Sequence, residues 1–179
     1  NQLRHQIDLW ANDLGFQQAG ITGVDVGEHE QYLRSWLAAG YHGTMAYMAD
    51  HGTMRSRPQE LLPGTLRVIG LRMDYLAPDV SITEQLQDKN QAYISRYALG
   101  RDYHKLVRKR LTQLGKLIQQ AAGEMGFRAF VDSAPVLERA LAQRAGLGWQ
   151  GKNTMLINRK AGSYFFLGEI LTDLPLPTD

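Results

Sequence analysis

The sequence contains no cysteine. This absence excludes disulfides, zinc ribbons, thiolate nucleophiles and iron–sulfur ligation by this chain. No run approaches the ~18 apolar residues of a membrane span, and the N-terminus lacks the pattern of a signal peptide. We therefore expect a soluble, cytoplasmic protein that makes no membrane contact.

Histidine is also sparse, with five residues that never pair at the spacing of metal ligands on a helix or strand (His5, His29, His42, His51 and His104). The sequence therefore predicts no protein-ligated metal, and a zinc or di-iron centre is excluded. A Gly-x-Ser-x-Gly elbow is absent as well, which argues against a serine hydrolase of the α/β type.

The remaining composition is that of an ordinary globular protein. The chain has 179 residues, 44% of them hydrophobic and 21% charged, with 20 Lys and Arg against 18 Asp and Glu. This length and apolar content support one domain, with room for a small annex, and exclude disorder as a description of the whole chain.

Hydrophobic periodicity predicts strands alternating with helices. We expect a long surface loop over 75–89, a linker-like tail over 174–179, and a hairpin formed by the last two strands around a turn at 158–162. The expected class is α/β, with a mixed sheet flanked by helices in a sandwich. The predicted helices cover 3–14, 28–39, 103–125 and 136–145, and the predicted strands cover 19–24, 66–73, 127–131, 154–157 and 164–171.

Positive charge is concentrated between residues 96 and 110. Six basic residues occur there with Asp102 as the one acid (Arg96, Arg101, Lys105, Arg108, Lys109 and Arg110). Such a patch can contact phosphates. A solvated helix face explains the same pattern, and charge alone does not separate the two interpretations.

The segment 146–152 (GLGWQGK) satisfies the first part of a phosphate-loop motif. Asn153 stands where that motif needs Ser or Thr, and the predicted order is helix, turn, strand rather than strand, loop, helix. Nucleotide hydrolysis is therefore excluded, and a helix-to-strand turn is the favoured interpretation.

Asp132 follows the apolar strand predicted over 127–131 and precedes a helix. Ligands of α/β proteins bind at such strand ends. A carboxyl at an apolar rim is held in its protonated form by desolvation, so Asp132 could act as an acid. The alternative is that Asp132 caps the following helix, which would favour the ionised carboxylate.

Five strings together resemble the epoxyqueuosine reductases, in the order of that family and across nearly the whole chain. They are 57–69 (RPQELLPGTLRVI), 95–104 (SRYALGRDYH), 131–139 (VDSAPVLER), 145–153 (AGLGWQGKN) and 162–169 (GSYFFLGE). The resemblance implies a cobalamin-dependent oxidoreductase that removes the epoxide oxygen of epoxyqueuosine in the anticodon loop of tRNA, giving queuosine in the last step of queuosine biosynthesis.

The resemblance also assigns residues. Asp132 would donate a proton to the epoxide oxygen. Contacts to the cobalamin would come from Arg57, Ser95, Asp132, Leu156 and Leu167, with Lys152 and Asn153 as weaker candidates.

The family continues into a ferredoxin-like module with two 4Fe-4S clusters, which need cysteine thiolates that this chain lacks. We therefore expect residues 1–179 to be the cobalamin-binding catalytic domain, truncated before that module and inactive alone. The expected partners are the tRNA and an external electron donor, and the expected state is a monomer. A non-catalytic cobalamin- or RNA-binding module and a flavin-using reductase remain alternatives.

Overall fold

The computed structural model describes residues 2–76 and 81–179. A four-stranded sheet lies at its centre, and a two-stranded ribbon lies apart from it. The helices are α1 (Gln2–Asp13), α2 (His29–Ala38), α3 (Pro58–Leu61), α4 (Ile82–Gln87), α5 (Tyr103–Ala122) and α6 (Glu138–Arg144), and the strands are β1 (Gln18–Thr22), β2 (Arg67–Asp74), β3 (Phe127–Phe130), β4 (Trp149–Gln150), β5 (Leu156–Ile157) and β6 (Phe165–Thr172).

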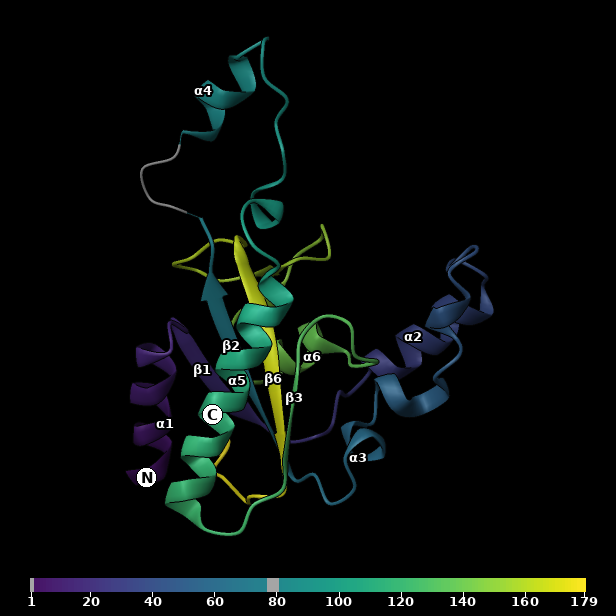
Figure 1. The fold of residues 1–179 in the computed structure, drawn as a ribbon. Helices are drawn as coiled ribbons and strands as arrows, with labels where there is room; N and C mark the ends of the chain where they lie inside the picture. The colour runs from purple at the N-terminus through teal and green to yellow at the C-terminus, as the bar shows by residue number, and fades with distance from the viewer. Residues whose placement is uncertain (1, 77–80) are drawn as a thin grey trace.

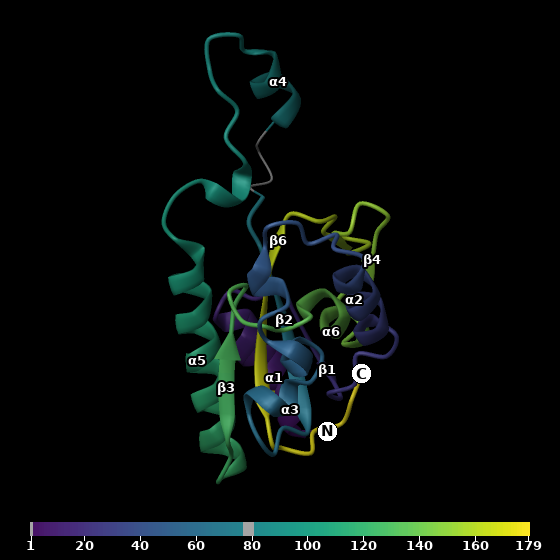
Figure 2. The same ribbon diagram turned by 90° about the vertical axis from the view of Figure 1, so that its right-hand side faces the viewer.

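Helices cover both faces of the central sheet (Figures 1 and 2). Helices α1 and α5 pack on one face, where Ile7, Leu111 and Ile118 are completely buried. Helix α6 packs on the other face, where Leu141 is buried against Val68 and Leu171. The predicted α/β class with flanking helices is therefore confirmed, and the apolar stripe of α5 faces the sheet as its periodicity requires.

The sheet has the order β1-β2-β6-β3, and each of its three pairings is antiparallel, rather than the mixed arrangement that we expected. One register row runs across all four strands through Gly20, Gly70, Glu169 and Phe130. A Cβ on Gly20 would lie 1.9 Å from the carbonyl oxygen of Ala145, so these glycines let the end of α6 approach the sheet closely.

The predicted C-terminal hairpin is wrong. Strand β5 pairs with β4, whereas β6 pairs with β2 and β3. The turn at 158–162 forms a single bridge between Asn158 and Gly162. Long-range pairing through the middle of the sheet buries more of the apolar strand β6 than a local hairpin would, which explains the difference.

Two further segments differ from expectation. The predicted loop over 75–89 contains α4, and the Ser81 hydroxyl caps the first turn of this helix by accepting a hydrogen bond from the Glu84 N–H. Residues 77–80 of the predicted loop lie outside the described residues. The tail is not a free linker, because Leu176 is buried and the Asp179 carboxylate accepts from the Ile21 N–H at 2.8 Å.

Two excursions extend beyond the layered core. The segment carrying α4 extends past the ends of β2 and β6, and α2 lies apart from the sheet on the side of α6 (Figures 1 and 2). Among the described residues, no helix combines the length and the apolar character that a membrane crossing requires.

Candidate functional site

A cavity of about 1090 Å³ is lined in part by Glu138, Arg139 and Ala140 at the start of α6. Its walls come from segments far apart in the sequence: α2, the turns around Met48 and Arg55, the start of α5, the loop after β3, and the strands β5 and β6. This volume exceeds the ~300–1,000 Å³ of pockets for drug-sized ligands, so the cavity suits a large ligand.

Aromatic side chains form one wall of the cavity. The rings of Tyr103 and Phe166 stack with centroids 3.9 Å apart, and Tyr75 contacts Phe166 at 4.6 Å. Tyr97 and Phe165 also line the cavity. A wall of rings offers broad, flat, apolar contact area to a planar ligand.

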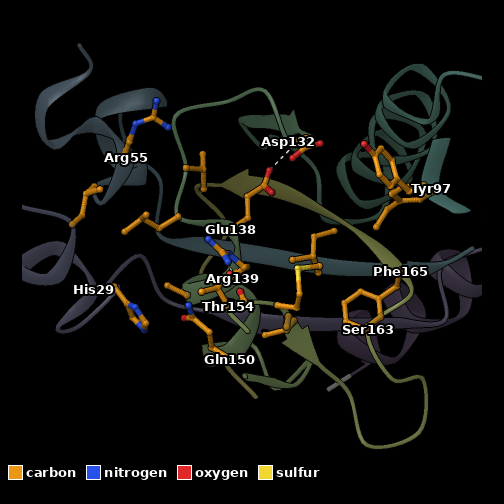
Figure 3. Close-up of a pocket in the computed structure, with 18 of the residues that line it drawn as sticks. His29, Arg55, Tyr97, Asp132, Glu138, Arg139, Gln150, Thr154, Ser163 and Phe165 are labelled. Carbon is orange, nitrogen blue, oxygen red and sulfur yellow. Dashed lines mark hydrogen bonds between the residues drawn. The ribbon is translucent and has the colours of Figure 1, made fainter. Parts of the chain in front are cut away.

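Asp132 lies at the rim of this cavity (Figure 3). The Tyr103 hydroxyl donates a hydrogen bond to its Oδ2, and His104 Nε2 lies 3.3 Å from the same oxygen. The other ring nitrogen of His104, Nδ1, lies 2.9 Å from Asp102. The start of α5 thus presents a phenol and an imidazole to Asp132, and the imidazole bridges two carboxylates.

The charges around Asp132 perturb its neighbours. Partial burial raises the pKa of Tyr103, and its hydrogen bond to Asp132 raises it further. The hydrogen bond from His104 lowers the pKa of Asp102. Tyr103 therefore remains a hydrogen-bond donor, and Asp102 remains an acceptor that orients the imidazole.

Two further carboxyls lie behind Asp132. Glu138, the first residue of α6, accepts a hydrogen bond from the Asp132 backbone N–H at 2.6 Å (Figure 3). Glu169, in the middle of β6, is 1% exposed. Burial raises the pKa of Glu138 to about 7, with a further contribution from the charge of Asp132, and burial raises the pKa of Glu169 well above its usual range.

The expectation for Asp132 needs correcting on two points. Its side chain is 54% exposed, so desolvation acts on Glu138 and Glu169 rather than on Asp132 itself. Asp132 also does not cap the next helix, since the residue before α6 is Leu137. The sequence analysis missed both glutamates as site residues, although a charged residue inside the apolar run 165–171 was a signal for Glu169.

The structure brings three of the predicted cofactor contacts to the cavity and leaves four away from its lining. Asp132, Leu156 and Leu167 line it. Lys152 and Asn153 are exposed on the turn beside it, next to the lining residues Gln150 and Thr154.

Arg57 and Ser95 also lie outside the lining. The Arg57 guanidinium is paired with Glu30 of α2 at 3.1 Å, and its hydrogen bonds lower the pKa of Glu30 to about 2. Ser95 is exposed before the single 3₁₀ turn Arg96–Ala98. As cofactor contacts, these residues stay predictions.

The glycine-rich segment 146–152 is a helix-to-strand turn, as the sequence predicted. Helix α6 ends at Arg144, and β4 begins at Trp149. A Cβ on Gly148 would lie 2.3 Å from the carbonyl oxygen of Ile157, so this glycine permits close approach of β5. Within 2–76 and 81–179, no three His, Asp or Glu side chains gather as a metal site.

Comparisons with known proteins agree with this geometry. The family model described as "Epoxyqueuosine reductase QueG, DUF1730" matches residues 55–133. The epoxyqueuosine reductase of Pseudomonas aeruginosa is 64% identical over 178 residues, which are 99% of this chain and 49% of that protein. The solved epoxyqueuosine reductase from Streptococcus thermophilus matches with a TM-score of 0.85 at 26% identity, over 100% of this chain and 48% of that one.

Two more distant structures share the fold. An epoxyqueuosine reductase solved with an epoxyqueuosine-modified tRNA-Tyr stem loop has a TM-score of 0.84 at 24% identity, over 99% of this chain and 47% of that one. A reductive dehalogenase described as B12-dependent has a TM-score of 0.56 at 15% identity, over 99% and 20%. The resemblance seen in the sequence is therefore confirmed: over essentially its whole length, this chain matches about half the length of the epoxyqueuosine reductases.

Proposed function

We propose that this chain forms the cobalamin-binding catalytic part of an epoxyqueuosine reductase. The observation that carries the proposal is the position of Asp132, at the rim of a large aromatic-lined cavity and in contact with Tyr103 and His104. The 64% identity to a reductase of that name supports the same assignment.

The cavity fits the cofactor that the resemblance implies. Its volume and its wall of stacked rings suit one face of a corrin macrocycle. Leu156 and Leu167 would pack against the macrocycle, while Arg57, Ser95, Lys152 and Asn153 are the candidates for its polar periphery. When bound, cobalamin supplies the reducing electrons at its metal, which the side chains of this chain cannot do.

The protein contributes the proton chemistry. Removal of the epoxide oxygen takes up two electrons and two protons and releases one water. Asp132 donates a proton to the epoxide oxygen as the C–O bond breaks. His104, within reach of the same carboxyl and oriented by Asp102, passes the next proton to Asp132.

Part of the basic run lies beside the Asp132 turn. Lys105 and Arg108 of α5 line a small depression of about 80 Å³ together with His104, Val131 and Ser133, directly beside the Asp132 turn. Phosphates of a tRNA anticodon loop would bind these two cations while the modified base enters the cavity.

The electron supply belongs outside this chain. A cysteine-free sequence cannot hold the 4Fe-4S clusters that the resemblance implies. Clusters elsewhere in the longer protein, with an external donor, would supply the electrons. A cytoplasmic location and a monomeric state remain predictions.

The test is Asp132→Asn in the longer protein that carries the clusters. We expect cobalamin to bind normally, as followed by its visible absorption, and epoxide reduction to fall by roughly 10²–10⁴-fold, the contribution of a positioned acid. Asp13→Asn is the matched control, because Asp13 is exposed at the end of α1. Full turnover in Asp132→Asn would remove Asp132 from the acid role.

A further inference from the structure

The backbone at Asp132 has an unusual conformation. Asp132 has a φ of 54°, one of two positive values found for non-glycine residues in the described chain. The Ser133 N–H donates to the Val131 carbonyl oxygen at 2.5 Å, which closes a three-residue turn centred on Asp132. Turns of this kind with positive φ are rare and strained, so surrounding contacts must hold them.

Glu138 supplies such a contact. Its carboxyl accepts the Asp132 N–H at 2.6 Å, across the loop from the first turn of α6. The same loop is tethered at its other end, where the Leu137 N–H donates to the Arg55 carbonyl oxygen at 2.9 Å. The direction of the Asp132 side chain therefore depends on the acceptor that Glu138 provides.

Glu169 explains how Glu138, which is half-buried, can remain a good hydrogen-bond acceptor. Among the described residues, neither Glu169 oxygen has a hydrogen-bond partner, and after burial the charge of Glu138 contributes most to raising the Glu169 pKa. A fully buried carboxyl without a donor keeps its proton. Donated to Glu138, that proton would stabilise the ionised form of Glu138, in keeping with the lowering contribution of Glu169 to the Glu138 pKa. The other charges facing the pair are Asp132 and, on α6 itself, Arg139.

We propose that Glu138, half-buried at the cavity wall, and the fully buried Glu169 form a carboxyl pair sharing one proton, and that this pair holds the Asp132 turn so that the Asp132 carboxyl faces the cavity. Glu138 is then a positioning residue that acts through the Asp132 backbone, and Glu169 is its proton-bearing support. The link to catalysis rests on the proposed function, whereas the link to the turn does not.

The direct test follows the Asp132 amide by NMR in the ¹⁵N-labelled protein. Between about pH 5 and 9, its proton signal should titrate with a midpoint of about 7, because protonated Glu138 is a weaker acceptor. In Glu138→Ala the titration should vanish, and solvent exchange of this amide should quicken by roughly tenfold or more. An Asp132 amide that does not titrate in the parent protein would overturn the proposal.

Conservative variants separate positioning from folding. Glu138→Gln keeps a carbonyl acceptor, so the slow exchange should survive while the titration is lost. Glu169→Gln keeps a donor and should preserve the turn, whereas Glu169→Leu should raise the midpoint of the Asp132 titration. Glu124→Gln, at an exposed position after α5, is the charge-matched control. Equal amide behaviour in Glu169→Gln and Glu169→Leu would exclude the shared proton.

The outcome is independent of the chemistry assigned to Asp132. Asp132→Asn leaves the backbone N–H in place, so its amide should still titrate with Glu138. If that variant retains full epoxide reduction while its amide titrates, the proposed function fails and the carboxyl pair stands. If Glu138→Ala and Glu138→Gln reduce turnover equally in the cobalamin-loaded protein, the positioning role fails and the proposed function stands.

Discussion

The close seating of α6 on the sheet can be tested at a single glycine. In Gly20→Ala, the new Cβ would lie 1.9 Å from the Ala145 carbonyl oxygen and 2.9 Å from its carbonyl carbon. Carbon and oxygen atoms in contact normally stay about 3.3 Å apart, so the end of α6 must move by about 1.4 Å. Because main-chain atoms are on both sides, no side-chain rotation can relieve this clash.

The expected cost follows from this geometry. Overpacking of a core lowers the free energy of unfolding by about 1–3 kcal/mol. Replacing glycine by alanine also lowers the entropy of the unfolded chain, which raises the free energy of unfolding by about 0.4–1 kcal/mol. With a rigid neighbour the upper part of the range applies, so we expect a net loss of about 2 kcal/mol in the free energy of unfolding. For a chain of this size, that loss lowers Tm by about 4–8 °C.

Thermal unfolding followed by circular dichroism measures the effect. Gly23→Ala is the matched control, because a Cβ on Gly23 meets nothing within 4 Å and its φ is not positive. That control should be neutral or stabilised by up to about 1 kcal/mol. If Gly20→Ala melts with the parent protein, α6 does not lie against β1, and the geometry that aims Glu138 at the Asp132 turn is wrong.

Three further predictions follow from charges. Because the pKa of Glu138 rises from 4.5 to about 7 on folding, the folded state binds this proton more tightly, and the free energy of unfolding should fall as pH rises from about 4.5 to 7. Urea unfolding across that range should show this slope, and the slope should be flatter in Glu138→Gln. A free energy of unfolding that rises with pH there would contradict the burial that raises the Glu138 pKa. The double variant Lys105→Glu, Arg108→Glu should weaken binding of a tRNA stem loop and reduce the slope of log K against log salt concentration by about 0.7–0.9 per lost phosphate contact. The control Lys116→Glu, farther along α5, should change neither. Unchanged binding in the double variant would remove this surface from the substrate path. Asp179→Ala should lower the free energy of unfolding by about 1 kcal/mol, since its carboxylate accepts from the main chain of β1; an unchanged denaturation midpoint would mean that the tail is not anchored.

Local sequence signals predicted most elements of the fold. Helix α1 ends before Gly15, which has a φ of 82°, as that glycine indicated, whereas α5 ends at Ala122, before Gly123 with its φ of 92°, rather than at residue 125 as predicted. Helix α4 was missed although its signal was present. Ser81 and Glu84 stand at the spacing of a capping box, and the Ser81 hydroxyl accepts from the Glu84 N–H.

Strand pairing was beyond local signals. The turn at 158–162 reads as a hairpin, yet β6 pairs with β2 and β3, which come far earlier in the chain. No local sequence pattern within 154–171 identifies β2 and β3 as the strands that pair with β6. A largely buried eight-residue strand gains more from pairing with the eight residues of β2 and the four of β3 than from the two residues of β5.

The site was predictable in part for the same reason. Asp132 could be singled out because it ends an apolar strand, a local feature. The groups around Asp132 could not be predicted, because Glu138 accepts the Asp132 N–H from the far end of a loop and Glu169 lies in the centre of the distant strand β6. The burial that the sequence analysis assigned to Asp132 belongs mainly to Glu169, which pairs with Gly70 in the middle of the sheet.

This division of roles has a physical basis. Under the proposed function, Asp132 must regain its proton in every cycle, and its half-exposed carboxyl is accessible to solvent and lies 3.3 Å from His104 Nε2. A carboxyl that holds a strained turn must not exchange its hydrogen bond for water, so it belongs where water is excluded. Asp132 at the exposed rim meets the first requirement, and Glu138, half-buried and supported by the fully buried Glu169, approaches the second. Moving the Glu169 carboxyl to solvent would leave Glu138 without the donor that keeps it an acceptor.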